Sequence, residues 1–182
     1  EMNGIKFAYI FKLAGTLFLI TALVAAALAG VNSITAPRIA AINAEKTQKA
    51  VEEVLPGGGE LLAEGSYDNQ GGKIAEVYKS DKGFAVKVLP MGFDNTITMM
   101  VGVDLDGKVT GISIISHTET AGLGAVAADK GDDGQAFRGQ FVGKSGVLEV
   151  GTDIDAISSA TITSKAVTEG VNMALKCVDG LK

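Results

Sequence analysis

The sequence predicts an α+β fold in which a single N-terminal transmembrane helix precedes one domain with an antiparallel sheet flanked by helices. Three observations lead to this prediction: a long uncharged apolar stretch near the start, four β-like segments separated by short turns, and apolar residues at helical spacing near the end. A chain of 182 residues is long enough for one ordinary domain and an accessory segment.

The first element is a stretch without a charged residue from Leu13 to Pro37. It exceeds the roughly 20 residues that a helix needs to cross a lipid bilayer. A cleaved signal peptide is the alternative, because Lys6 and Lys12 form a basic leader and Ala27-Leu28-Ala29 resembles a cleavage site. Because the apolar run is long, we expect a retained transmembrane helix that spans residues 13–36.

The charges around this span predict its orientation. Lys6 and Lys12 precede it, so the positive-inside rule places segment 1–12 in the cytoplasm and the rest of the chain outside. The predicted location is therefore the cell membrane, single-pass, with the following domain on the extracytoplasmic side. The span contains no ionisable residue and provides no ion relay of its own.

An amphipathic helix is predicted to connect the span to the domain. Apolar residues recur at helical spacing within Ile39–Leu55, opposite glutamate and lysine side chains. Pro37 lies near the start, where proline is tolerated, and Pro56-Gly57-Gly58-Gly59 ends the helix. We assign 37–56 to this connecting helix and 57–182 to the domain.

Four segments of the domain have the composition of β-strands and are separated by turn-like residues. Short loops between consecutive strands favour an antiparallel meander. The predicted strands are Lys73–Lys79, Phe84–Leu89, Thr96–Val103 and Lys108–Ser116. The polar stretch Asp129–Gly134 is expected to be an exposed loop.

Composition excludes several classes of function. A net charge of −5 argues against nucleic-acid binding, which requires a basic face. With one histidine and one cysteine, neither a disulfide nor a transition-metal site is expected. Cys177 lies in a helical pattern, so we expect it to be a small apolar packing residue.

A cluster of five hydroxyl side chains within Ser158–Ser164 directly precedes the C-terminal helical pattern. Such a cluster commonly caps a helix, because a side-chain oxygen accepts a hydrogen bond from a free backbone N–H. The same helix start, with Lys165 in its first turn, also suits a phosphate group. The residues alone leave both interpretations open.

The stretch Asp155, Ser158, Ala160 and Thr161 resembles the Asp-x-x-Ser/Thr-Gly-Ala-Thr flavinylation motif of the RnfG/NqrC family. In that family the threonine oxygen carries FMN through a phosphoester bond, which implies Thr161 as the FMN phosphoryl acceptor. Ser159 stands where the family usually has glycine, so a positive φ there would strain the backbone. By the same resemblance Ser158, Ala160 and Thr163 belong to the cofactor site.

Two further elements resemble the same family, in the same order along the chain. His117–Gly124 is similar to His-x-Glu-Thr-Pro-Gly-Leu-Gly, with Ala121 in place of proline, and Phe137–Lys144 is similar to Phe-x-x-Gln-Phe-x-Gly-Lys. The resemblance implies that four residues of the first element border the flavin: Glu119, Thr120, Gly122 and Leu123. It also implies that Lys144 lies near the flavin ring or the phosphate.

The resemblance, closest to the Rnf branch, implies an electron-relay flavoprotein subunit of a membrane-bound ion-translocating ferredoxin:NAD⁺ oxidoreductase complex. It implies covalent FMN, an extracytoplasmic FMN-binding domain, the other Rnf subunits as partners, and a separate flavin transferase that attaches FMN from FAD with Mg²⁺. The subunit would have no complete activity alone, because the chain has neither a Gly-x-Gly-x-x-Gly fingerprint in a strand–helix setting nor iron–sulfur cysteines.

Three alternatives remain open. The same flavin domain serves in the sodium-pumping quinone reductase and in extracellular flavin carriers. A hydrolase using the Ser/Thr cluster is disfavoured because neither Ser-x-x-Lys nor Gly-x-Ser-x-Gly occurs; position 162, three residues before Lys165, is isoleucine. An anchored, non-redox binding scaffold with a decayed motif is the third alternative, and a retained covalent flavin would exclude it.

Overall fold

The computed structural model describes residues 2–182, with side chains from Tyr9 onward. Residue 1 and the side chain of Lys6, both in the predicted cytoplasmic segment 1–12, lie outside the described part. The chain divides into two compact units, 1–45 and 46–182.

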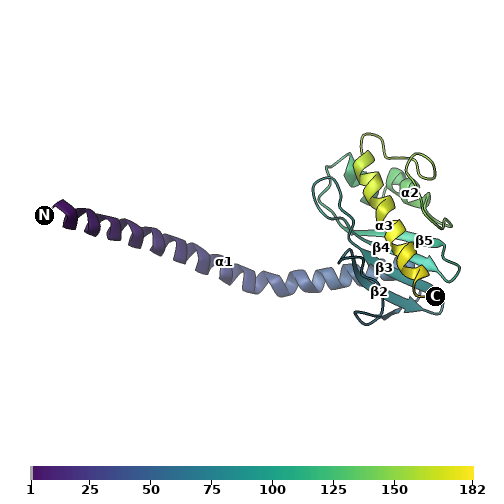
Figure 1. The fold of residues 1–182 in the computed structure, drawn as a ribbon, viewed down its shortest axis with the longest axis horizontal. Coiled ribbons are helices and arrows are strands. Elements are labelled where there is room, and N and C mark those ends of the chain that lie inside the picture. The colour runs from purple at the N-terminus through teal and green to yellow at the C-terminus, as the bar shows by residue number, and fades with distance from the viewer. Residues whose placement is uncertain (1) are drawn as a thin grey trace. The chain divides into compact units, whose positions relative to one another are not determined.

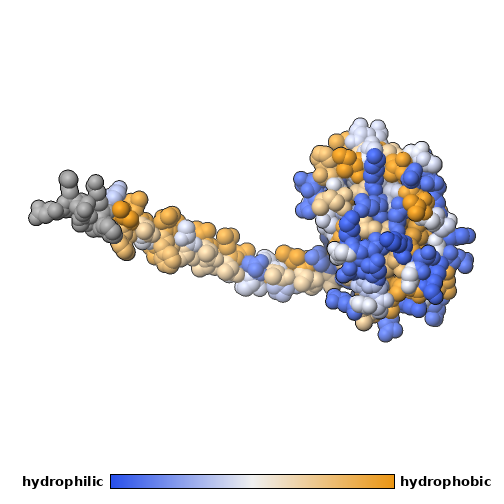
Figure 2. Space-filling view, viewed as in Figure 1, coloured by the Kyte–Doolittle hydropathy of each residue, from blue (hydrophilic) through white to orange (hydrophobic). Residues whose placement is uncertain are grey.

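The N-terminal unit is formed by helix α1, which spans Met2–Val54 and continues into the second unit. Apolar residues predominate on the described N-terminal part of the face that Figure 2 shows, and by length and composition the helix is able to cross a membrane. Pro37 lies inside α1, so the predicted segments 13–36 and 37–56 form one helix. A proline removes one intrahelical hydrogen bond, but the residues on both sides of it favour a helix, so the helix continues through Pro37.

The second unit is built on a five-stranded antiparallel meander in the order β1-β2-β3-β4-β5. Its strands are β1 (Glu60–Leu61), β2 (Ile74–Ser80), β3 (Gly83–Val88), β4 (Thr98–Asp104) and β5 (Val109–Ser116). The four long strands confirm the predicted ones to within two residues at each end. Gly83, at φ 150°, ends the turn between β2 and β3, and Gly107, at φ 84°, lies in the turn between β4 and β5, as the sequence indicates.

Helices cover one face of the sheet (Figure 1). These are the 3₁₀-helix η1 (Gly124–Ala128), α2 (Asp132–Gly139) and α3 (Thr161–Asp179). Helix α3 packs against β3 and β4, with Val167, Val171 and Val178 fully buried. Helix α2 begins inside the stretch predicted as a loop, because Asp132 and Asp133 favour a helix start while Gly134 and Gly139 conceal its pattern. The predicted α+β class is confirmed.

The last turns of α1 lie on the opposite face of the sheet. Val51, Val54 and Leu55 are buried there with Met100. A Cβ on Gly102 would lie 2.4 Å from the carbonyl oxygen of Val54, so this glycine permits the close approach of the helix.

Three polar side chains lie beside the contact between the last turns of α1 and the sheet. Lys87 Nζ lies 2.8 Å from a carboxylate oxygen of Glu76, and the Tyr78 hydroxyl donates to the other oxygen at 2.6 Å. Burial raises the pKa of Glu76, but the hydrogen bonds from Lys87 and Tyr78 outweigh it and lower the pKa overall.

Candidate functional site

The start of helix α3 is a free helix N-terminus. Ala160 is the N-cap residue and makes no side-chain capping bond, and the first helical backbone bond runs from the N–H of Ser164 to the carbonyl of Ala160 at 3.0 Å. The N–H groups of Thr161, Ile162 and Thr163 are therefore left without a protein acceptor within the described residues. Together with the helix dipole they form a place suited to an anion.

The five hydroxyls of the Ser/Thr cluster separate into two groups. Ser164 donates to the carbonyl of Ala160 and accepts the N–H of Ile157, both at 3.0 Å, and Thr163 donates to the Glu119 carboxylate. Both residues are buried. The other three, Ser158, Ser159 and Thr161, are exposed, and none of them makes a side-chain hydrogen bond within the described residues. The capping interpretation fails, since no cluster hydroxyl caps α3.

Ser159 adopts a left-handed backbone conformation with φ 61°. This is the positive φ that the family's usual glycine would accept without strain, and an L-residue there costs roughly 1–2 kcal/mol. The conformation closes a tight turn in which the N–H of Ala160 donates to the carbonyl of Ile157 at 3.0 Å. The turn presents Thr161 at the first position of the helix.

Glu119 connects three segments around this turn. Its side chain is buried, with one oxygen accepting the N–H of Phe93 at 2.9 Å and the other accepting the Thr163 hydroxyl. Cβ atoms on Gly92 and Gly124 would lie 2.2 Å and 2.5 Å from these oxygens. Glu119 thus binds the loop before β4 and the first turn of α3 to its own segment, in a space that only glycines leave open.

Gln140 holds the start of the flavinylation-like stretch. Its amide oxygen accepts the N–H of Asp155 at 2.7 Å, and its amide nitrogen donates to the carbonyl of the same residue at 3.3 Å. Phe137 and Phe141 on either side are buried and contact each other edge to face, with centroids 5.5 Å apart. The Phe-x-x-Gln-Phe element therefore anchors residue 155 to the core through α2.

Two hollows lie on either side of the turn at Ser158 and Ser159. The first, of about 410 Å³, contains six of the nine predicted site residues: Glu119, Thr120, Leu123, Ala160, Thr161 and Thr163. The second, of about 570 Å³, contains Gly122 and Ser158, together with Asp155 and Gln140. Both volumes are in the range of roughly 300–1,000 Å³ typical of small-molecule sites.

Lys144, the ninth predicted site residue, lines neither hollow. Gly143 turns the chain at φ 79°, and the carbonyl of Lys144 accepts the N–H of Val109, the first residue of β5. The Phe-x-x-Gln-Phe-x-Gly-Lys element thus contributes Gln140 to this region but not its lysine.

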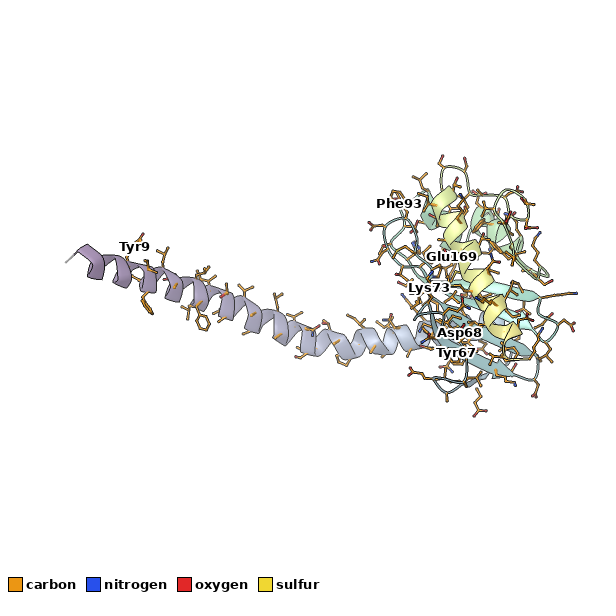
Figure 3. All side chains as sticks on the ribbon, viewed as in Figure 1. Tyr9, Tyr67, Asp68, Lys73, Phe93 and Glu169 are labelled. Atoms are coloured by element: carbon orange, nitrogen blue, oxygen red, sulfur yellow. The ribbon has the colours of Figure 1, made fainter. Side chains whose placement is uncertain are left out.

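Phe93 is a residue of this region that the sequence analysis missed. It lies near the first turn of α3 (Figure 3), its side chain is 66% exposed, and it lines the first hollow with the exposed Leu123 and Ile162. The sequence feature that could have indicated Phe93 is an aromatic residue within a glycine-containing turn. A turn exposes its side chains, and an exposed aromatic ring leaves a large apolar surface in water. His117 lines neither hollow, and its Nδ1 is buried without a hydrogen-bond partner among the described residues.

Comparison with known proteins gives two family matches. Residues 92–176 match an FMN-binding domain, and residues 2–54 match the N-terminal region of RnfG. The chain is 36% identical to the G subunit of the Na⁺-translocating ferredoxin:NAD⁺ oxidoreductase complex of Acetobacterium woodii, over 100% of this chain and 97% of that protein. It is 29% identical to the G subunit of an ion-translocating oxidoreductase complex of Methanosarcina acetivorans, over 92% and 93%. The G subunit of a proton-translocating ferredoxin:NAD⁺ oxidoreductase complex from Clostridium ljungdahlii is 42% identical over 56% of this chain and 58% of that protein.

Proposed function

The chain belongs to the RnfG family of ion-translocating oxidoreductase subunits, and on this premise we propose that it carries FMN on Thr161 and relays electrons. The complex would be a membrane-bound ferredoxin:NAD⁺ oxidoreductase, with its other subunits as partners. Helix α1 would anchor the chain in the lipid bilayer, with the second unit on the extracytoplasmic side of the cell membrane. Bound FMN would supply the electron-transfer chemistry, while the protein attaches and orients it.

The observation that carries this proposal is the position of the Thr161 hydroxyl. It is exposed, it begins a helix of 19 residues with an uncapped N-terminus, and it borders the first hollow. A phosphate esterified to this oxygen would lie at the positive end of the helix dipole, within reach of free N–H groups. The exposed Lys165 adds a positive charge one turn further along.

The surroundings of Thr161 fit the rest of an FMN molecule. Phe93, Leu123 and Ile162 offer exposed apolar surface around the first hollow, against which an aromatic ring system gains contact area. At the second hollow, Gly122 has φ 75° and no atom within 4 Å of an added Cβ, so a ligand is able to approach its backbone.

Burial supports Thr161 over Thr163 as the acceptor. The Thr163 hydroxyl is buried and already donates its proton to Glu119. A transferase has to reach the attacking oxygen, and Thr161 leaves its oxygen open to solvent. In the proposed attachment this oxygen bonds to the FMN phosphorus of FAD, the pyrophosphate bond breaks, AMP leaves, and the hydroxyl proton passes to the flavin transferase.

Flavin fluorescence of the denatured chain tests the acceptor assignment. The full chain is produced together with a flavin transferase, and its peptides are mapped by mass spectrometry. We expect the mass of esterified FMN on the peptide that contains Thr161, and complete loss of covalent fluorescence in Thr161→Ala. Thr152→Ala makes the same change at an exposed threonine that lines neither hollow, and serves as the matched control with fluorescence retained. Flavin retained in Thr161→Ala would contradict the assignment.

A further inference from the structure

The two edges of the sheet differ in how they are protected against pairing with another strand. Edge strand β1 has only two residues, one of which is Glu60. Edge strand β5 has eight residues, Val-Thr-Gly-Ile-Ser-Ile-Ile-Ser, with no charge and no proline. Short length, charge and proline are the usual means by which proteins block edge pairing, and β5 has none of them.

The outer side of β5 is open along most of its length. Within the described part of the chain its first residue alone is paired there: Val109 donates its N–H to the carbonyl of Lys144 at 2.9 Å and accepts the N–H of Gly143 at 2.8 Å. From residue 110 to residue 116 the described part of the chain makes no backbone hydrogen bond to this strand from outside the sheet. The outward-facing N–H and carbonyl groups of this segment thus form a free row of alternating donors and acceptors.

A groove of about 590 Å³ runs beside this free edge. It is lined by Gly111 and Ile112 of β5, by Glu53 and Val54 of α1, by Gly139 at the end of α2 and by Val142 beyond that helix. Val142 is an exposed apolar residue, and a side chain added at Gly139 would meet no atom within 4 Å of its Cβ. The edge therefore has both the hydrogen-bonding groups and the space that an added strand requires.

We propose that the edge of β5 is a docking site for an extended segment of another subunit of the complex, which adds a sixth strand to the sheet. Main-chain hydrogen bonds would provide the affinity, and the groove would select the side chains of the segment. An apolar residue would contact Val142. This proposal relies on the proposed assembly with other subunits, but not on the flavin.

Charge in the groove distinguishes a partner strand from a second copy of this chain. Arg138 is occupied, since its guanidinium donates to the carbonyls of Ala127 at 2.6 Å and Asp129 at 2.8 Å. The Glu53 carboxylate also lines the groove and accepts a hydrogen bond from the Ser113 hydroxyl at 2.6 Å. The Lys130 ammonium lines the same groove and makes no hydrogen bond or ion pair within the described residues. A docking segment with an acidic residue would complement it, and β5 of a second copy has no acidic residue to offer.

Amide hydrogen exchange of the peptide covering 110–116 tests the proposal directly. The full chain in detergent is compared with the same chain within the purified complex. We expect the outward-facing amides of this peptide to exchange at least roughly tenfold more slowly in the complex, as in a paired strand. Equal exchange in the two samples would overturn the proposal, as would protection in the isolated chain that rises with its concentration, which would indicate pairing of two copies.

Groove variants test the same surface by assembly. Val142→Glu and Gly139→Glu each place a negative charge in the groove, and recovery of the chain with a tagged partner subunit is measured. We expect recovery to fall at least roughly tenfold, since the added carboxylate would repel the acidic residue of the docking segment. Val147→Glu makes the same change at an exposed valine outside the groove, so normal recovery is expected.

Flavin content separates this result from a failure of the proposed function. Covalent flavin fluorescence of each groove variant is measured beside its assembly, and we expect it to be unchanged because neither Gly139 nor Val142 lines the hollows at Thr161. Normal recovery of both groove variants would overturn the docking proposal whether or not flavin is present.

Discussion

The first turn of α3 and the turns that follow it differ in most properties that stabilise a helix. At the start Thr161 and Ile162 are exposed, the cap makes no side-chain bond, and Ser159 holds a strained left-handed turn. Further along, Val171 and Val178 are fully buried against the sheet. Burial of the later turns stabilises α3 enough to offset the strain and exposure at its start. The start of the helix is therefore available for a ligand.

The largest loss of stability is expected from a cavity in the buried part of α3. Leu175 is 8% exposed and belongs to the main core. Leu175→Ala should lower the free energy of unfolding by about 2–5 kcal/mol through lost burial and an unfilled cavity. Urea unfolding measures the change. Because Leu175 lies far along α3 from Thr161, covalent flavin fluorescence of the folded variant should stay normal, and its loss would contradict the separation of the two regions.

A pH titration tests the same buried part of α3. Burial raises the pKa of the Cys177 thiol from 9.0 to about 11, and Asp68 adds to the effect. Since the folded pKa lies above the ordinary one, this contribution to stability is complete below pH 9 and is lost as pH rises through about 11. The difference in urea midpoint between wild type and Cys177→Ala should therefore change between about pH 8 and about pH 11. A constant difference would show that the thiol is not buried as described.

Glu119 belongs to the helix start but is itself buried, so its removal should have an intermediate effect. Glu119→Ala leaves the N–H of Phe93 and the hydroxyl of Thr163 without their acceptor, which should cost about 1–3 kcal/mol. Glu119→Gln keeps one acceptor oxygen and is expected to lose less. Thermal unfolding measures stability, and the rate of flavin attachment by the transferase measures the loss of order around Thr161. An equal loss in both variants would indicate that the charge, not the hydrogen bonding, is required.

Relief of strain at the helix start should have a smaller effect of opposite sign. Ser159→Gly places the residue that tolerates φ 61° at this position, and should stabilise the protein by about 1 kcal/mol after the greater freedom of glycine when unfolded is subtracted. Ser158→Gly, one residue earlier and without a positive φ, is the control and should destabilise slightly. A destabilised Ser159→Gly variant would mean that the serine side chain stabilises the turn.

The sequence predicted the buried parts of the domain better than the contacts at the site. The predicted strand ends lie within two residues of the observed ones, because residues typical of turns separate the consecutive strands of the meander. The contact between Glu119 and Thr163 joins residues 44 positions apart, and no local pattern reveals it. Lys144 lines neither hollow, because a motif gives the order of residues along the chain but not the position of each side chain around a site. Helix α2 was missed because its glycines hide its helical pattern.

The smallest effect on stability is expected where the proposed effect on function is largest. Thr161 is exposed and its hydroxyl makes no hydrogen bond within the described residues, so Thr161→Ala should change the free energy of unfolding by less than about 0.5 kcal/mol. Urea unfolding of flavin-free wild type and variant measures this difference without the contribution of bound ligand. Thr163→Ala removes a buried hydroxyl paired with Glu119 and should cost clearly more. If Thr161→Ala were the more damaging of the two, the hydroxyl at the helix start would have a structural role, and its availability for esterification would no longer explain its position.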